Sequence, residues 1–193
     1  MKRLYIILIS IFFFSCSHHS YKNPHVTIST RLGDIEVELF PEQAPKTVAA
    51  FLSYVDAGIY KDVSFYRVLK GEELPTDYNT GIIQGGIYQS TGKKPGLISP
   101  IPHEPTTQSG LSHTNGVISF ASLGAGTATT EFFICIGDQS VMDATRSGTA
   151  DKQGFAAFGK VFKGMDVVRK IQNQKSRGDK FEVSVDILNI KRL

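Results

Sequence analysis

The chain has 193 residues, of which 41% are hydrophobic and 20% charged, with no tryptophan and a formal net charge of +3. This length and composition are ordinary for a globular protein with one well-buried core. Two of the 21 basic residues lie at positions 2 and 3, so the remaining chain is nearly neutral, which gives no electrostatic case for a nucleic-acid partner.

The first 15 residues have the pattern of an export signal. Lys2 and Arg3 precede an almost unbroken apolar run over residues 4–14. The run is too short for a membrane-spanning helix, which needs about 20 residues. Cys16 follows directly, and "FFFSC" resembles a bacterial lipobox, in which the cysteine is acylated. We expect a signal peptide at 1–15 and lipid attachment at Cys16; ordinary signal-peptidase cleavage is the alternative.

Residues 16–24 are polar and predict a tether, followed by a single domain at 25–193. The expected location is the cell envelope, as a membrane-anchored lipoprotein at a periplasmic or outer-membrane face. With Cys16 acylated, Cys135 is the remaining thiol, so no disulfide framework is expected. His18 and His19 do not have the spacing of a metal site with Cys16, and no metal is expected.

Alternating polar and apolar residues at 25–40, on both sides of Gly33 and Asp34, predict a β-hairpin. A helix is expected next, because Pro45 suits a first turn and Gly58 suits an end. Between them Val48, Phe51, Leu52 and Val55 form an i, i+3, i+4, i+7 stripe. Further strands are predicted at 63–69, 82–85, 117–122, 132–136, 155–161 and 183–191, and a second helix at 164–173.

This order lacks the βαβ repeat of parallel α/β folds, so it indicates an antiparallel sheet or barrel. Strict alternation in the strand at 63–69 would put Arg67 on the apolar face formed by Val63, Phe65 and Leu69. Three long loops, at 71–81, 88–115 and 143–154, are of a length that usually carries function.

Acid–base, metal and nucleotide motifs are weak. Residues 122–133 lack the Gly-Lys-Ser/Thr of a P-loop, and no Gly-x-Ser-x-Gly elbow occurs. His103 and His113 have no nucleophile placed beside them by a motif, so they are interpreted as loop or core histidines.

Five segments in one order carry a joint resemblance: "FYRV" at 65–68, "IQGG" at 83–86, "GVISFAS" at 116–122, "FFIC" at 132–135 and "FAAFGKVFKGMDVV" at 155–168. Together they resemble the cyclophilin family of peptidyl-prolyl cis-trans isomerases over essentially the whole domain. The resemblance implies a mainly β fold, a closed eight-stranded antiparallel β-barrel capped by two α-helices. The active groove would lie on the outer surface of the barrel.

By this resemblance Arg67 is the catalytic hydrogen-bond donor, and Gln84 steadies the carbonyl side of the substrate. Phe133 would floor the proline pocket, with Phe65 nearby. The other substrate-binding residues that it implies are Ile82, Ala121, Ser122, Met142 and Phe155.

The sequence departs from the family pattern at two places near the groove. Glu131 stands where the family usually has glutamine. An insert at 72–81 displaces the usual pocket phenylalanine, and Gly81 falls at the aligned place. We expect the insert to close part of the pocket itself, with Tyr78 as the candidate side chain.

The sequence therefore predicts a monomeric, cofactor-independent isomerase that acts on X–Pro bonds of exported proteins. Its expected partners are proline-containing polypeptides and the membrane that holds its lipid. A poorly catalytic chaperone of the same fold, which only binds proline segments, is the alternative. A surface lipoprotein whose loops bind another protein is a third.

Overall fold

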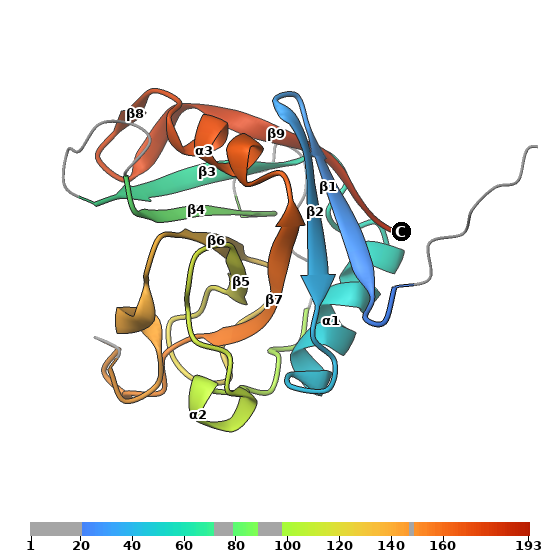
Figure 1. The fold of residues 1–193 in the computed structure, drawn as a ribbon, viewed down its shortest axis with the longest axis vertical. Coiled ribbons are helices and arrows are strands. Elements are labelled where there is room, and N and C mark those ends of the chain that lie inside the picture. Colours follow the sequence, from blue (N-terminus) through green and yellow to red (C-terminus); the bar gives the residue numbers. More distant parts are fainter. Residues whose placement is uncertain (1–20, 72–78, 89–97, 147–148) are drawn as a thin grey trace, which may run out of the picture.

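In the computed structural model, which describes residues 21–71, 79–88, 98–146 and 149–193, eight antiparallel strands form a closed ring (Figure 1). The ring runs β1-β2-β7-β5-β6-β4-β3-β9, and β9 pairs back onto β1. The predicted mainly β, closed eight-stranded barrel is confirmed. Its strands are β1 His25–Thr30, β2 Gly33–Leu39, β3 Val63–Lys70, β4 Gly81–Gly86, β5 Val117–Phe120, β6 Phe132–Ile136, β7 Ala156–Lys163 and β9 Lys180–Arg192.

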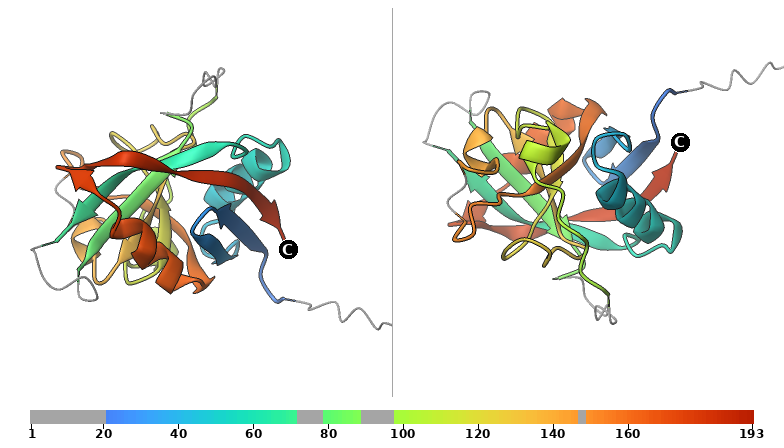
Figure 2. Two further views of the ribbon diagram at one scale, coloured as in Figure 1. Left: turned by 90° about the horizontal axis from the view of Figure 1, so that it is seen from above. Right: turned by 90° about the horizontal axis from the view of Figure 1, so that it is seen from below.

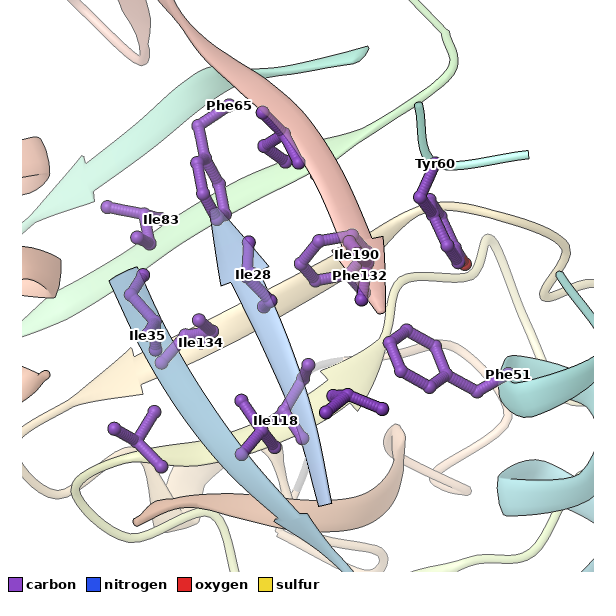
Figure 3. Close-up of a cluster of buried hydrophobic side chains, with 14 of the residues drawn as sticks. Ile28, Ile35, Phe51, Tyr60, Phe65, Ile83, Ile118, Phe132, Ile134 and Ile190 are labelled. Atoms are coloured by element: carbon purple, nitrogen blue, oxygen red, sulfur yellow. The ribbon is translucent and has the colours of Figure 1, made fainter. Parts of the chain in front are cut away.

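The barrel interior is a close-packed apolar core (Figure 3). Phe51, from the first helix, lies with ring centroids 5.0 to 6.1 Å from Phe158, Tyr60, Phe120 and Phe132. Aromatic rings at these distances add to the stabilisation that burial alone provides. The buried Tyr60 hydroxyl donates to the Thr130 carbonyl at 3.0 Å, so its polar end is satisfied.

Two helices cap different ends of the barrel (Figures 1 and 2). Helix α1, Pro45–Asp56, buries the predicted apolar stripe, and α3, Met165–Gln172, buries Val167, Val168 and Ile171. None of the helices in the described ranges is long and apolar enough to cross a membrane. The sequence pattern missed three shorter elements: α2 Thr106–Ser109, the 3-10 helix η1 Ser140–Met142, and β8 Ser176–Arg177, which pairs with β9.

The start of α1 is capped from a distance. Ala44, at the N-cap, offers no side-chain acceptor. The Glu104 carboxylate replaces it, accepting from the backbone N–H of Lys46 (3.2 Å), the N–H of Thr47 (2.8 Å) and the Thr47 hydroxyl (2.7 Å). A negative charge is also favoured at a helix N-terminus. Glu104 thereby joins the segment before α2 to the start of α1.

Strand β3 contains a β-bulge that corrects the alternation expected from the sequence. The strand's pairing with β4 shifts by one residue between Phe65 and Arg67, which makes Tyr66 an extra residue. Phe65 and Val68 therefore point into the core, whereas Tyr66, Arg67 and Leu69 face outward. The expectation that Phe65 and Arg67 share one face is wrong, because the bulge switches faces between them.

Asp151, in the segment before β7, bonds the turn that follows β5. Its Oδ2 accepts from the Ala125 N–H at 2.7 Å, and its Oδ1 accepts from Gln153 N–H and the Thr149 hydroxyl. Thr127 closes the 123–127 turn by accepting from the N–H groups of residues 123 and 124. The 143–154 loop thus holds the turn that follows β5.

We predict that Glu104→Ala lowers the free energy of unfolding by about 1–3 kcal/mol, because it leaves buried N–H donors of α1 without an acceptor. Glu104 is 1% exposed, so water cannot replace the carboxylate without entering the interior. Urea unfolding checks this, with the exposed Glu42→Ala in the turn that precedes α1 as control. Equal stability of the two variants would contradict the capping role.

Asp151 should make the fold sensitive to acid. The three hydrogen bonds that its carboxylate accepts lower the pKa of Asp151 from the ordinary 3.8 to about 2. A depressed folded-state pKa stabilises the protein above the unfolded-state value, and this stabilisation disappears as the pH falls through the folded-state value. The difference in Tm between wild type and Asp151→Asn should therefore shrink from about pH 5 to about pH 2. A constant difference over this interval would refute the assignment.

Candidate active site

A groove of about 820 Å³ lies on the outer surface of the barrel across β3, β4 and β6. A volume of this order suits a peptide segment or a small ligand. Eight of the nine predicted catalytic and substrate-binding residues line it: Arg67, Ile82, Gln84, Ala121, Ser122, Phe133, Met142 and Phe155.

The ninth, Phe65, does not. It is fully buried inside the barrel, with its ring 5.8 Å from that of Phe132, and Figure 3 shows it pointing toward the core side chains. The physical reason is the bulge, which directs the next two side chains outward. Phe65 therefore supports the wall of the groove from behind.

The floor of the groove is an apolar cluster separate from the barrel core. Ile82, Phe133 and Cys135 are buried in it, and Met142 and Phe155 pack against them. The Phe155 ring meets the Phe133 ring edge to face, with centroids 5.4 Å apart. Burial raises the pKa of the Cys135 thiol, so it stays neutral. The cluster gives a dry surface for an apolar ring.

Below the floor, the buried His113 stacks on Phe133 with ring centroids 5.8 Å apart. Its Nδ1 lies 2.7 Å from Asp143 Oδ1, and its Nε2 lies 3.0 Å from the Ser119 hydroxyl. Burial lowers the His113 pKa, which favours the neutral ring. The neutral ring then donates from Nδ1 to the carboxylate and accepts from Ser119 at Nε2. His113 is thus a core histidine that holds the floor.

Arg67 forms part of the wall beside this floor. Its Nε–H donates to Asp179 Oδ2 at 2.9 Å, and one Nη1–H donates to Gln84 Oε1 at 2.9 Å. Within the part of the chain that the structure describes, the other Nη1–H and both Nη2–H groups have no protein partner. The two acceptors fix the plane of the guanidinium, and its remaining donors are available to a ligand in the groove.

The wall continues from Gln84 to Tyr66, which the sequence reasoning did not place in the site, and to Glu131, which it placed near the groove. Gln84 Nε2 donates to the Tyr66 hydroxyl at 3.0 Å, which donates to Glu131 Oε2 at 2.7 Å. Glu131 Oε1 also accepts from the N–H groups of Ile87 and Tyr88. Burial raises the Glu131 pKa, although the hydrogen bonds that the carboxylate accepts oppose this rise.

Gly86 makes room for the Glu131 carboxylate. A Cβ at this position would lie 2.5 Å from the carboxyl atoms, and the φ of +148° disfavours any other residue. The sequence shows Glu131 in place of the family's usual glutamine, but it could not show these contacts. Other lining residues that the sequence reasoning missed are Tyr88, Leu123, Thr127, Thr129, Asp179 and Lys180.

Several expectations lie outside the described residues: the signal peptide, Cys16, and Tyr78 with most of the insert at 72–81. Tyr21, the first described residue, stacks on His25 with ring centroids 3.7 Å apart. No group of three or more potential metal ligands occurs among the residues whose placement is described.

The site offers fixed hydrogen-bond donors beside an apolar floor. The Ser119 hydroxyl lies next to His113, but both residues are fully buried and do not line the groove, so they are not placed to attack a bound ligand. Such a site can stabilise a dipole in a bound ligand.

The comparisons with known proteins agree with this chemistry. The family of cyclophilin type peptidyl-prolyl cis-trans isomerases matches residues 25–192.

A peptidyl-prolyl cis-trans isomerase of Acinetobacter baylyi is 35% identical over 174 residues, which cover 90% of this chain and 83% of the relative. Peptidyl-prolyl cis-trans isomerase B of Escherichia coli is 34% identical over 148 residues, covering 76% of this chain and 83% of the relative.

Among solved structures, a cyclophilin type isomerase of Cryptosporidium parvum superposes with a TM-score of 0.70 at 26% identity, over 89% of this chain and 98% of its own. Its structure in the presence of the dipeptide Ala-Pro gives a TM-score of 0.67 at 26% identity, over 86% and 97% of the two chains. The chain therefore belongs to the cyclophilin-type peptidyl-prolyl cis-trans isomerases, the enzyme family that its motifs predict.

Proposed function

We propose that this isomerase assists the folding of exported proteins from a lipid anchor at Cys16, and that Arg67 is its catalytic residue. The observation that carries the catalytic assignment is the guanidinium itself. It is held by Gln84 and Asp179 at the wall of an apolar groove, with donors left for a ligand.

The physical chemistry of the X–Pro bond explains why one fixed donor is useful. Rotation about the C–N bond meets a barrier of about 18–20 kcal/mol because amide resonance is lost. At the top of the barrier the proline nitrogen regains its lone pair and accepts a hydrogen bond better than in either planar state. A donor that is already in place therefore favours the twisted amide over the ground states. No proton transfer or covalent intermediate is needed.

The groove supports a proline-containing polypeptide as substrate. Phe133 and its neighbours form an apolar surface for the pyrrolidine ring. Ala121 and Ser122 line the groove just beyond the end of β5 at Phe120, where a substrate backbone can lie alongside. The related Cryptosporidium parvum structure determined with Ala-Pro supports the same class of ligand.

The position of β1 in the ring supports an anchored enzyme that works away from its anchor. The chain enters the barrel at β1, and β1 lies four strands from β6 in either direction around the ring. Tyr21 packs on His25 at this entry point. A lipid on Cys16 would therefore hold the domain from the side of the barrel opposite the floor of the groove.

We predict that Arg67→Ala lowers kcat/KM on a short Ala-Pro peptide by on the order of 10²-fold, since a preorganised transition-state donor is lost. Arg67→Lys should stay strongly impaired, because one ammonium cannot replace the planar fork that bonds Gln84 and Asp179. Protease-coupled or NMR exchange measurements of cis-to-trans rates check both variants. Arg192→Ala is the matched control, because Arg192 pairs with Asp56 outside the groove.

Equal rates for wild type and Arg67→Ala would contradict the catalytic assignment. Retained peptide binding together with slow isomerisation in the wild type would instead favour the alternative, a chaperone that binds proline segments. Equilibrium binding of the same peptide distinguishes these outcomes.

The anchor gives a separate prediction. Cells that express the full chain should incorporate labelled palmitate into the protein, and Cys16→Ala should abolish the label and release the protein from the membrane fraction. The variant keeps Cys135, the buried thiol, so it also controls for acylation at another cysteine. Label retained in Cys16→Ala would contradict the anchor.

A further inference from the structure

A continuous chain of hydrogen-bonded side chains runs along the wall of the groove. From Arg67 it passes to Gln84 at 2.9 Å, from Gln84 to Tyr66 at 3.0 Å, and from Tyr66 to Glu131 at 2.7 Å. These residues come from β3 and β4, and from the position just before β6. This row of hydrogen bonds therefore connects Arg67 to the Glu131 carboxylate across three strands.

The two ends of this chain decide its direction. A guanidinium has only donors, so the Gln84 oxygen must face Arg67, and the Gln84 amide NH₂ must then face Tyr66. An ionised carboxylate has only acceptors, so the Tyr66 hydrogen must point to Glu131. Every hydrogen bond therefore runs from Arg67 toward Glu131, and the reversed arrangement is excluded at both ends.

The Tyr66 hydroxyl depends on protein partners, because the residue is almost completely buried. It is 6% exposed, and a buried hydroxyl needs partners. The Tyr66 hydroxyl accepts a hydrogen bond from Gln84 and donates one to Glu131, so both its acceptor and its donor functions are satisfied. Burial, and then the Glu131 hydrogen bond, raises the Tyr66 pKa, so the phenol stays neutral and keeps its proton for the carboxylate.

Glu131 is itself held rigidly. Its Oε1 accepts from two backbone N–H groups, those of Ile87 and Tyr88, and from the Thr130 hydroxyl at 3.1 Å. The glycine at position 86 leaves the space in which the carboxylate sits. A terminal acceptor fixed in this way can hold the rest of the chain in one orientation.

We propose that Glu131, acting through Tyr66, is a positioning residue for the isomerase reaction. It holds the Gln84 amide with its oxygen toward Arg67, so that the guanidinium presents its remaining donors to the groove in one orientation. This rests on the donor role proposed for Arg67. A glutamine in place of Glu131 could both donate and accept, so it would not fix the direction of the chain.

Tyr66→Phe tests the link. It removes only the hydroxyl, so Gln84 loses its acceptor and the arginine loses a fixed neighbour. We expect kcat on an Ala-Pro peptide to fall about tenfold, which corresponds to about 1.4 kcal/mol in the barrier, while KM changes much less. Tyr54→Phe, at a half-buried residue of α1 outside the groove, is the matched control and should keep the wild-type kcat. A Tyr66→Phe enzyme with the kcat of Tyr54→Phe would overturn the proposal.

Glu131→Gln gives a second readout, which also serves if Tyr66→Phe fails to fold. Protonation of Glu131 puts a hydrogen at the end that must accept, and burial raises the Glu131 pKa above the usual glutamate range. The wild-type kcat should therefore fall on the acid side with this titration, and the fall should be absent in Glu131→Gln. An unchanged acid limb in the variant would overturn the proposal.

The groups that face Glu131 make this readout specific. Among the described residues, Tyr66 on β3, Tyr60 after α1 and Tyr88 after β4 are titratable residues near it. Burial raises the pKa of Tyr66 and of Tyr60, so neither of these ionises in acid. Arg67 lies beyond Gln84 and stays charged. His113 and Asp143, below the floor, are unchanged in Glu131→Gln, so any acid titration of theirs remains in both enzymes.

Arg67→Ala separates this proposal from the assignment on which it rests. If Arg67→Ala is inactive and Tyr66→Phe and Glu131→Gln behave as the wild type, only the positioning role fails. If Arg67→Ala is fully active, the catalytic role of the arginine fails first.

Discussion

The pairing of β1 with β9 closes the sheet, and the other features of the molecule depend on this closure. It joins strands near the two ends of the domain, with Val26 opposite Arg192 and Ile28 opposite Ile190. A closed sheet has no free edges and gives every strand an inside and an outside. The inside is filled by the core, so the outside can carry a second apolar surface without competing for the same side chains.

Strand β6 shows how the two apolar surfaces share one backbone. Phe132, Ile134 and Ile136 belong to the barrel core, whereas Phe133 and Cys135 belong to the floor of the groove. All five residues are buried, so a continuous hydrophobic run here reflects two different environments. The floor therefore shares its backbone with the core, and His113, held by Asp143 and Ser119, stacks on Phe133 of the floor.

Most helices and strands could be predicted from the sequence because local periodicity determines them, whereas the closed eight-stranded barrel was implied by the family resemblance. The stripe from Val48 to Val55 and the alternation of the strands are properties of neighbouring residues. The missed features depend on distant pairings. The bulge that buries Phe65 is defined by the register with β4, and Asp179 reaches Arg67 from 112 positions away. The cap of α1 comes from Glu104, 57 positions beyond Thr47. Motif resemblance found most of the groove, but it could not show that Tyr66 and Glu131 bond to each other.

The bulge in β3 also affects how many functional side chains the strand can direct toward the groove. In a regular strand only one outward-facing side chain lies between two inward-facing ones. That single position could hold a guanidinium or a phenol, but not both. The extra residue gives the outer surface two consecutive side chains, Tyr66 and Arg67, while the core keeps the alternation that it requires. A one-residue irregularity thus places a phenol and a guanidinium side by side on the outer surface, while Phe65 and Val68 stay packed in the core.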